Sequence, residues 1–116
     1  MQKISIEALA RQQLKAATDS TSGRAADTVF GGHEKIMRQT VIALLDGRSL
    51  GEHENPGEAT IYVLSGRVQL RMGDVVWEGR TGDLLIVPDA RHSLAAIEDS
   101  TVLMTVAKKG QAMATG

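Results

Sequence analysis

The stretch HENPGEATIYVLSG, residues 53–66, decides the fold. It begins with a histidine and an asparagine two positions apart, passes through a Pro-Gly pair, and continues as an apolar run that ends at a glycine. A run rich in β-branched and aromatic residues between turn residues predicts a β-strand. Successive side chains of a strand point to opposite faces, so we expect His53 and Asn55 on one face and Glu54 on the other.

Similar apolar runs recur along most of the chain, separated by turns rich in Gly, Asp, Asn, Pro and Ser. Each of these residue types favours turns for a different conformational reason. Short strands that recur roughly every 8–12 residues are typical of an antiparallel sandwich or barrel. The predicted strands cover residues 26–30, 35–45, 50–55, 59–64, 68–72, 75–78, 83–87, 92–97 and 101–107.

One helix is predicted before the strands, from Ser5 to about Ala17. Ser5 suits the N-cap position, where a side-chain oxygen accepts a hydrogen bond from a free backbone N–H group. The apolar side chains form a narrow, alanine-rich stripe, so we expect the helix to lie on its own domain or on a partner subunit. This stripe consists of Ile6, Leu9, Ala10, Leu14 and Ala17.

The length of 116 residues suits a single domain. Thirteen basic residues nearly balance fourteen acidic ones, and there are only three aromatic residues. Nucleic-acid binding needs a basic surface and clustered aromatic side chains, so both features argue against it. We divide the chain into an N-terminal helix and loop (1–23), a β-barrel (24–108) and a flexible tail (109–116).

The absence of cysteine excludes disulfide bonds and thiol catalysis. No apolar run approaches the roughly 20 residues that cross a bilayer. Charged and amide residues interrupt the N-terminal segment, so it does not read as a signal peptide. We therefore expect a cytoplasmic protein that does not bind membranes.

Two spaced motifs resemble those of the cupins, which are small antiparallel jelly-roll barrels. The first cupin motif is Gly, five residues, His-x-His, three or four residues, Glu, six residues and Gly. Here Gly47, His53, Asn55, Ala59 and Gly66 stand at these positions with matching spacing. Two of the three metal-binding positions of the motif therefore carry different residue types.

The second cupin motif is Gly, five residues, Pro-x-Gly, two residues and His. Gly82, Pro88 and His92 follow this order, with one residue fewer between the proline and the histidine. The resemblance covers about residues 34–106 and is to small single-domain cupins of the cupin 2 conserved-barrel type. Together with the helix, it implies an all-β fold, a cupin-type antiparallel jelly-roll β-barrel with one N-terminal α-helix.

The resemblance also implies where a metal would bind. In metal-binding cupins, the two histidines and the glutamate of the first motif join the histidine of the second motif around one divalent metal. In this chain His53 and His92 remain, whereas Asn55 and Ala59 replace the other two ligands. A bulge near residues 55–58 could turn Glu58 inward, because bulges redirect side chains beside active sites.

With Glu58 inward, two histidines and one carboxylate would suit iron, manganese, zinc or nickel. Without it, the two imidazoles would make a weak site. Asn55 could add a neutral oxygen ligand or instead brace the turn that follows it. His33 is expected in solvent, and Asp89 and Arg91 at the rim of the cavity.

The rest of the cavity is expected to be apolar. Besides Asn55, the candidate wall residues are Ala59, Ile61, Val63, Ile86, Leu94 and Met104. A small cavity with two histidines at one end and aliphatic walls suits a small, partly apolar molecule.

Four functions stay open at this point. The first is a binding or sensing module with a reduced metal site, and the second is a divalent-metal-dependent oxygenase, isomerase or lyase that uses His53, His92 and Glu58. The third is a structural role with a filled cavity. The fourth is a metal-free enzyme with a histidine base. Small cupins are commonly dimers, so the resemblance also implies a homodimer, with the helix as a candidate interface.

Overall fold

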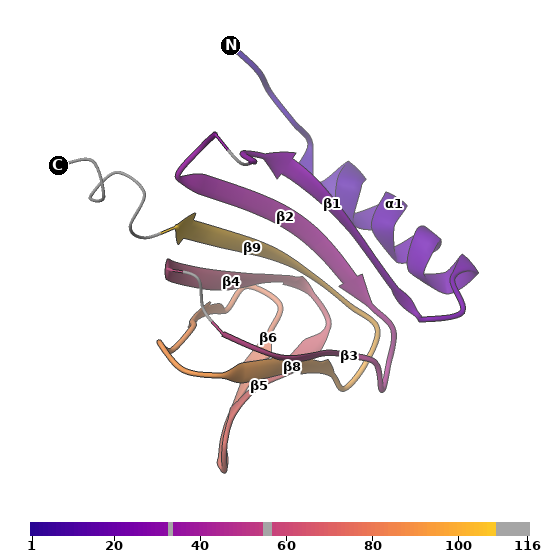
Figure 1. Cartoon of the computed structure of the whole chain (residues 1–116). Coiled ribbons are helices and arrows are strands. Elements are labelled where there is room, and N and C mark those ends of the chain that lie inside the picture. Colours follow the sequence, from indigo (N-terminus) through magenta and orange to yellow (C-terminus); the bar gives the residue numbers. More distant parts are fainter. Residues whose placement is uncertain (33, 55–56, 109–116) are drawn as a thin grey trace, which may run out of the picture.

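A computed structural model describes residues 1–32, 34–54 and 57–108. Within these residues, one helix, α1 (Ile6–Asp19), precedes nine strands (Figure 1). The strands are β1 (Arg24–Phe30), β2 (Met37–Leu44), β3 (Ser49–His53), β4 (Gly57–Ser65), β5 (Arg67–Met72), β6 (Val75–Arg80), β7 (Leu84–Ile86), β8 (His92–Ala96) and β9 (Ser100–Lys108). The predicted number and order of strands are therefore confirmed.

The strands form two antiparallel sheets that face each other (Figure 1). The five-stranded sheet has the order β1-β2-β9-β4-β7, and the four-stranded sheet has the order β3-β8-β5-β6. This is the predicted jelly-roll arrangement. In the described part of the chain, no ladder of hydrogen bonds joins the two sheets, so the barrel is not closed.

Alternation along the strands places the core between the sheets. In β4, Ile61 and Val63 are buried, while Tyr62 between them is 41% exposed. Burying a large aliphatic side chain contributes roughly 1.5–3 kcal/mol, so these rows hold the sheets together. The core consists of Ile42, Leu44, Ile61, Val63, Val68, Leu70, Leu85, Val87, Leu94, Ala96 and Val102.

The helix α1 covers the outer face of the five-stranded sheet over β1 and β2 (Figure 1). The side chain of Ser5 accepts a hydrogen bond from the N–H group of Ala8, which confirms the predicted N-cap. Ala10 and Ala17 are the buried residues of the helix, and small side chains there allow close approach to the sheet. The helix therefore packs on its own domain.

Strand ends differ from the prediction by a few residues. β3 ends at His53 and β4 begins at Gly57. The prediction of a flexible tail concerns residues 109–116, which lie outside the described residues. No helix in the described ranges is long and apolar enough to cross a membrane.

Candidate functional site

His53 and His92 face each other across neighbouring strands. They are direct cross-strand partners in the β3–β8 ladder. Their ring centroids lie 4.4 Å apart with the ring planes at 66°, an edge-to-face arrangement. This arrangement supports the expectation that two motif histidines, 39 positions apart in the sequence, meet at one place.

An irregularity in β3 brings His53 to this position. The β3–β8 register shifts by one residue between Leu50 and His53. In a regular strand, side chains three positions apart point to opposite faces. The extra residue at Gly51 or Glu52 resets the alternation, and both Leu50 and His53 consequently line the same cavity.

Both imidazole rings are held by the backbone in the same way. The Nδ1 atom of His53 lies 2.8 Å from the carbonyl oxygen of Gly51, and Nδ1 of His92 lies 2.8 Å from that of Ala90. A carbonyl oxygen can only accept, so Nδ1 carries the proton and donates in each ring. In the neutral rings, Nε2 is therefore the atom with the free lone pair. Metal-binding histidines are usually oriented by such hydrogen bonds.

The cavity beside the histidines is small. Its volume open to the centre of a water molecule is about 10 Å³, which is space for about one water molecule. His92 is only 4% exposed, and His53 is half-buried. The apolar walls come from both sheets: Ile42, Leu50, Ile61, Leu94, Val102 and Met104. Three of the predicted wall residues, Ile61, Leu94 and Met104, therefore lie at the cavity.

The structure does not bring Glu58 to the histidines, which corrects that expectation. β4 pairs with β9 in unbroken register from Gly57 to Val63, so no bulge turns Glu58 inward. Gly57 is buried, Glu58 is exposed and Ala59 packs against the core. Ala59 thus holds the inward position that the regular register of the motif implies, and the irregularity beside the site lies in β3.

Ile86 also differs from the prediction. It is 58% exposed, because in β7 only Leu85 points into the core and its two neighbours point outward. Val63 is fully buried in the core cluster but is not among the residues that line the cavity. Asn55 and His33 lie outside the described residues, so their predicted roles stay predictions.

The residues that the structure describes do not by themselves form a complete metal centre. Among the residues that the structure describes, no group of three or more His, Cys, Asp or Glu side chains is placed to share a metal ion. Catalytic zinc sites use three protein ligands and structural sites use four. The two Nε2 atoms alone supply only half of a tetrahedral donor set.

Charged side chains surround the site at its exposed rim. Arg91, next to His92, lies 3.3 Å from a carboxylate oxygen of Glu52 and 4.0 Å from one of Glu54. These ion pairs are more than half exposed, so each contributes little to stability. They connect Glu52 in β3 and Glu54 just after it to Arg91, the residue before His92.

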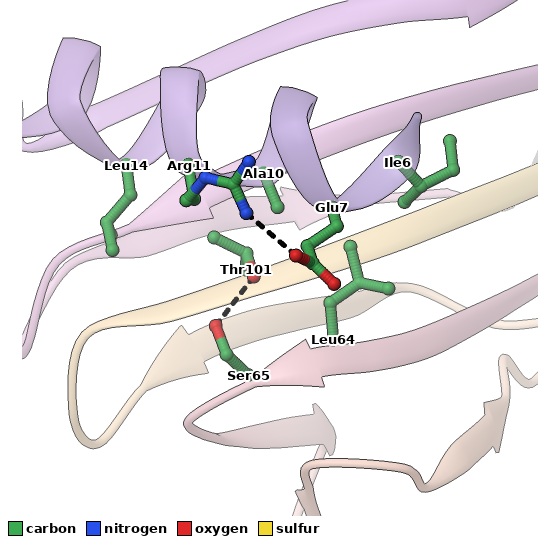
Figure 2. Close-up of a pocket in the computed structure, with 8 residues that line it drawn as sticks. All are labelled: Ile6, Glu7, Ala10, Arg11, Leu14, Leu64, Ser65 and Thr101. Carbon is green, nitrogen blue, oxygen red and sulfur yellow. Dashed lines mark hydrogen bonds and ion pairs between the residues drawn. The ribbon is translucent and has the colours of Figure 1, made fainter. Parts of the chain in front are cut away.

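Two of the larger hollows beside the described residues lie outside the barrel core. One, of about 300 Å³, lies between α1 and strands β4 and β9 (Figure 2). Its polar side chains are paired with each other: Arg11 with Glu7 at 2.8 Å, and Ser65 with Thr101 at 2.7 Å. The other, of about 560 Å³, is an open groove that includes Glu58, Ile86 and Asp89.

Three residues that line the cavity, Ile42, Leu50 and Val102, were not predicted from the sequence, and neither was the bulge. A glycine inside a strand pattern often marks a bulge, so Gly51 was the available signal. Leu50 could be assigned to the face of His53 only after the bulge had been placed.

Comparisons with known proteins agree with this fold. The cupin-domain family model matches residues 40–108, more than half of the chain. No curated protein matches the sequence.

Several solved structures resemble the chain. A conserved protein of unknown function from Streptococcus pyogenes has a TM-score of 0.70 and 24% identity, over 78% of this chain and 79% of its own. A cupin superfamily protein from Desulfitobacterium hafniense has a TM-score of 0.68 and 18% identity, over 74% and 78%. An RmlC-like cupin from Desulfovibrio desulfuricans has a TM-score of 0.64 and 26% identity, over 72% and 81%. The chain therefore belongs to the cupin-domain family.

Proposed function

We propose that this cupin domain is a binding module that holds a small molecule by one polar group at His53 and His92. The observation that carries the proposal is the pair of Nδ1 hydrogen bonds to Gly51 and Ala90. They leave two Nε2 lone pairs on adjacent rings next to an apolar cavity. Two adjacent acceptors suit a hydrogen-bond donor, so the favoured ligands are small alcohols and amines rather than carboxylates or phosphates.

The size of the cavity limits what enters it. Space for about one water molecule accepts a hydroxyl or amino group but not the body of a ligand. The other side chains that line the cavity are apolar, so His53 and His92 supply its side-chain hydrogen-bond partners for that group.

A divalent-metal enzyme is the second candidate. Its support is the same pair of oriented rings, because a histidine that donates Nδ1–H to a carbonyl has Nε2 available for a metal. The incomplete donor set among the described residues makes it the weaker candidate.

The first experiment measures the ring nitrogens of tag-free, ¹⁵N-labelled protein by NMR. We expect His53 and His92 to carry the proton on Nδ1, and their Nε2 signals to shift when methanol, ethanolamine or ethylamine is added. A His53→Ala, His92→Ala double variant should lose the response, and His33→Ala should keep it. Nε2 signals that none of these probes moves would argue against the binding function.

A zinc titration of the same samples separates the two candidates. Tight, stoichiometric Zn²⁺ binding that both histidines support would favour the metal-dependent function. Response to the alcohol and amine probes after chelator treatment, with weak zinc binding, would favour the metal-free binding module.

A further inference from the structure

The strand β6, one of the two outer strands of the four-stranded sheet, has an open edge. Within the described residues, β6 pairs only with β5. An exposed strand edge presents unpaired N–H and C=O groups that can pair with another strand. Natural proteins usually protect such an edge with charges, bulges or covering segments. An open edge with exposed apolar side chains is therefore a candidate site for pairing with another strand.

The backbone contacts of Arg67 show which groups of β6 face outward. Its N–H donates to the side chain of Ser100, and its C=O accepts from Ile97, so both point away from β6. Its partner Arg80 is therefore in a non-hydrogen-bonded pair. Because such pairs alternate with hydrogen-bonded ones, Val76 and Glu78 also direct their N–H and C=O groups to the open edge.

The same strand exposes large apolar side chains. Val75 is 46%, Val76 36% and Trp77 53% exposed. Val75 and Trp77 belong to the core face of the sheet, because Trp77 pairs with the buried Leu70. They remain exposed where the β5–β6 hairpin projects beyond the body of the fold (Figure 1).

We propose that β6 pairs with β6 of a second copy of this chain, antiparallel and around a two-fold axis at Trp77. The two four-stranded sheets then become one continuous sheet across the axis. The exposed Trp77 side chain packs against the partner's Trp77, and both open edges disappear. An isologous contact of this kind closes as a dimer.

Backbone geometry favours this register. Residues directly opposite each other share a face of the sheet, so the axis must place one residue opposite its own copy. With Trp77 on the axis, Val76 lies opposite the partner's Glu78. Both residues have outward-facing backbone groups, and they can exchange two hydrogen bonds on each side of the axis, whereas those of Arg80 are bonded to Asp83.

Charge complementarity selects the same register. With Trp77 on the axis, Asp74 lies opposite the partner's Arg80, and this opposite-charge pair occurs twice. Asp74, in the turn before β6, has no ion-pair partner in the described ranges, and the Arg80 side chain, 71% exposed, lies 3.6 Å from a carboxylate oxygen of Glu78. An axis at Val76 would instead place Asp74 opposite the partner's Glu78, and an axis at Glu78 would place two glutamates together. Like charges directly opposite each other are destabilising.

The backbone part of the proposal is tested by Val76→Pro with Val76→Thr as its matched control. Proline removes only an N–H group that β5 does not use, and edge strands tolerate it. In sedimentation velocity, we expect the wild type and Val76→Thr to pass from 12.4 kDa to twice that mass as concentration rises. Val76→Pro should dissociate at least tenfold more readily, with an unchanged circular dichroism spectrum.

The charge part has a test that does not depend on proline. Arg80→Asp puts a carboxylate opposite the partner's Asp74, and Asp74→Arg puts two cations opposite each other. Each single variant should weaken the dimer, whereas the chain that carries both substitutions should regain wild-type association because the pair is only exchanged.

The tryptophan reports where the copies meet. Trp77 is the single tryptophan of the chain, so its emission should move to shorter wavelength as the dimer forms. A monomer at every concentration would overturn the proposal. So would a dimer whose emission does not shift and which tolerates both Val76→Pro and Arg80→Asp, since it would use another face such as α1.

Discussion

His53 and His92 are direct cross-strand partners whose rings meet edge to face at 4.4 Å, yet the strand of His53 reaches this pairing only through a one-residue register shift. The pairing of the two histidines therefore depends on the local backbone of β3. The rest of the cavity wall is apolar and comes from both sheets.

Two isoleucines on paired strands should differ sharply in their effect on stability. Ile61 is 2% exposed and Ile86 is 58% exposed. Ile61→Ala should lower the free energy of unfolding by about 2–4 kcal/mol, because it leaves a cavity in the core. Ile86→Ala should change it by about 0.5 kcal/mol or less. Urea denaturation measures both, and equal losses would contradict the outward orientation of Ile86.

A carboxylate at position 59 should improve metal binding. Ala59 stands at the glutamate position of the cupin motif, and its side chain packs toward the core. In Ala59→Glu, we expect Zn²⁺ binding by calorimetry to strengthen about tenfold or more, or about 1.4 kcal/mol. Thr60→Glu is the control, since its neighbouring position faces the other side of the strand. Adding His92→Ala should abolish the gain; if it does not, the added carboxylate binds zinc elsewhere.

Two motif glycines with the same φ should respond differently to alanine. Gly66 has φ 91° and Gly82 has φ 92°. At Gly82 an added Cβ meets nothing within 4 Å, whereas at Gly66 it would collide with the Asp99 carbonyl oxygen and with Ser100.

Gly82→Ala should therefore cost about 1–2 kcal/mol of unfolding free energy for its backbone conformation alone. Gly66→Ala should cost clearly more, because the backbone of the β8–β9 turn must also move. Thermal and denaturant unfolding of the two variants give the comparison. Similar losses would mean that the turn moves aside freely.

The ion pair on the hairpin should give an acid-dependent contribution to stability. Hydrogen bonds from Arg67 at 2.6 and 2.9 Å hold the pKa of the Glu78 carboxyl below its usual value. A lowered pKa in the folded state stabilises above the unfolded-state pKa, and the contribution disappears as pH falls through the folded-state pKa.

NMR titration should thus find the pKa of Glu78 raised in Arg67→Gln relative to the wild type. The stability difference between the wild type and Glu78→Gln should be present near neutral pH and shrink in acid. An unchanged difference down to acidic pH would show that the carboxylate charge does not matter there.

The sequence predicted the helix, the strand order and the cupin fold because these depend on local patterns. Ser5, the apolar stripe of α1 and the glycine turns act through nearby residues. The two motifs added the long-range information that His53 and His92 meet.

The assignment of faces near the site could not be predicted equally well. A single-residue slip exchanges the two faces of a strand, and the position of a bulge depends on the partner strand. From the sequence, a bulge near Pro56 and Gly57 was an alternative that would have turned Glu58 inward. The irregularity beside the site lies at Gly51 or Glu52 instead, and Glu58 keeps the outward orientation of the regular register. The predicted inward orientation of Ile86 was wrong for a related reason. The strand β7 has only three residues, too few for the alternation of its side chains to be recognised in the sequence.

The hydrogen bonds of the two imidazoles also determine how the site responds to motion. His53 and His92 lie on the same sheet, and each ring is tied to a carbonyl two residues earlier in its own chain segment. The opposite wall, which includes Ile61 and Met104, belongs to the other sheet. A breathing motion that separates the sheets would therefore enlarge the cavity while the rings keep their mutual orientation. The site thus combines a rigid polar end with an adjustable apolar wall.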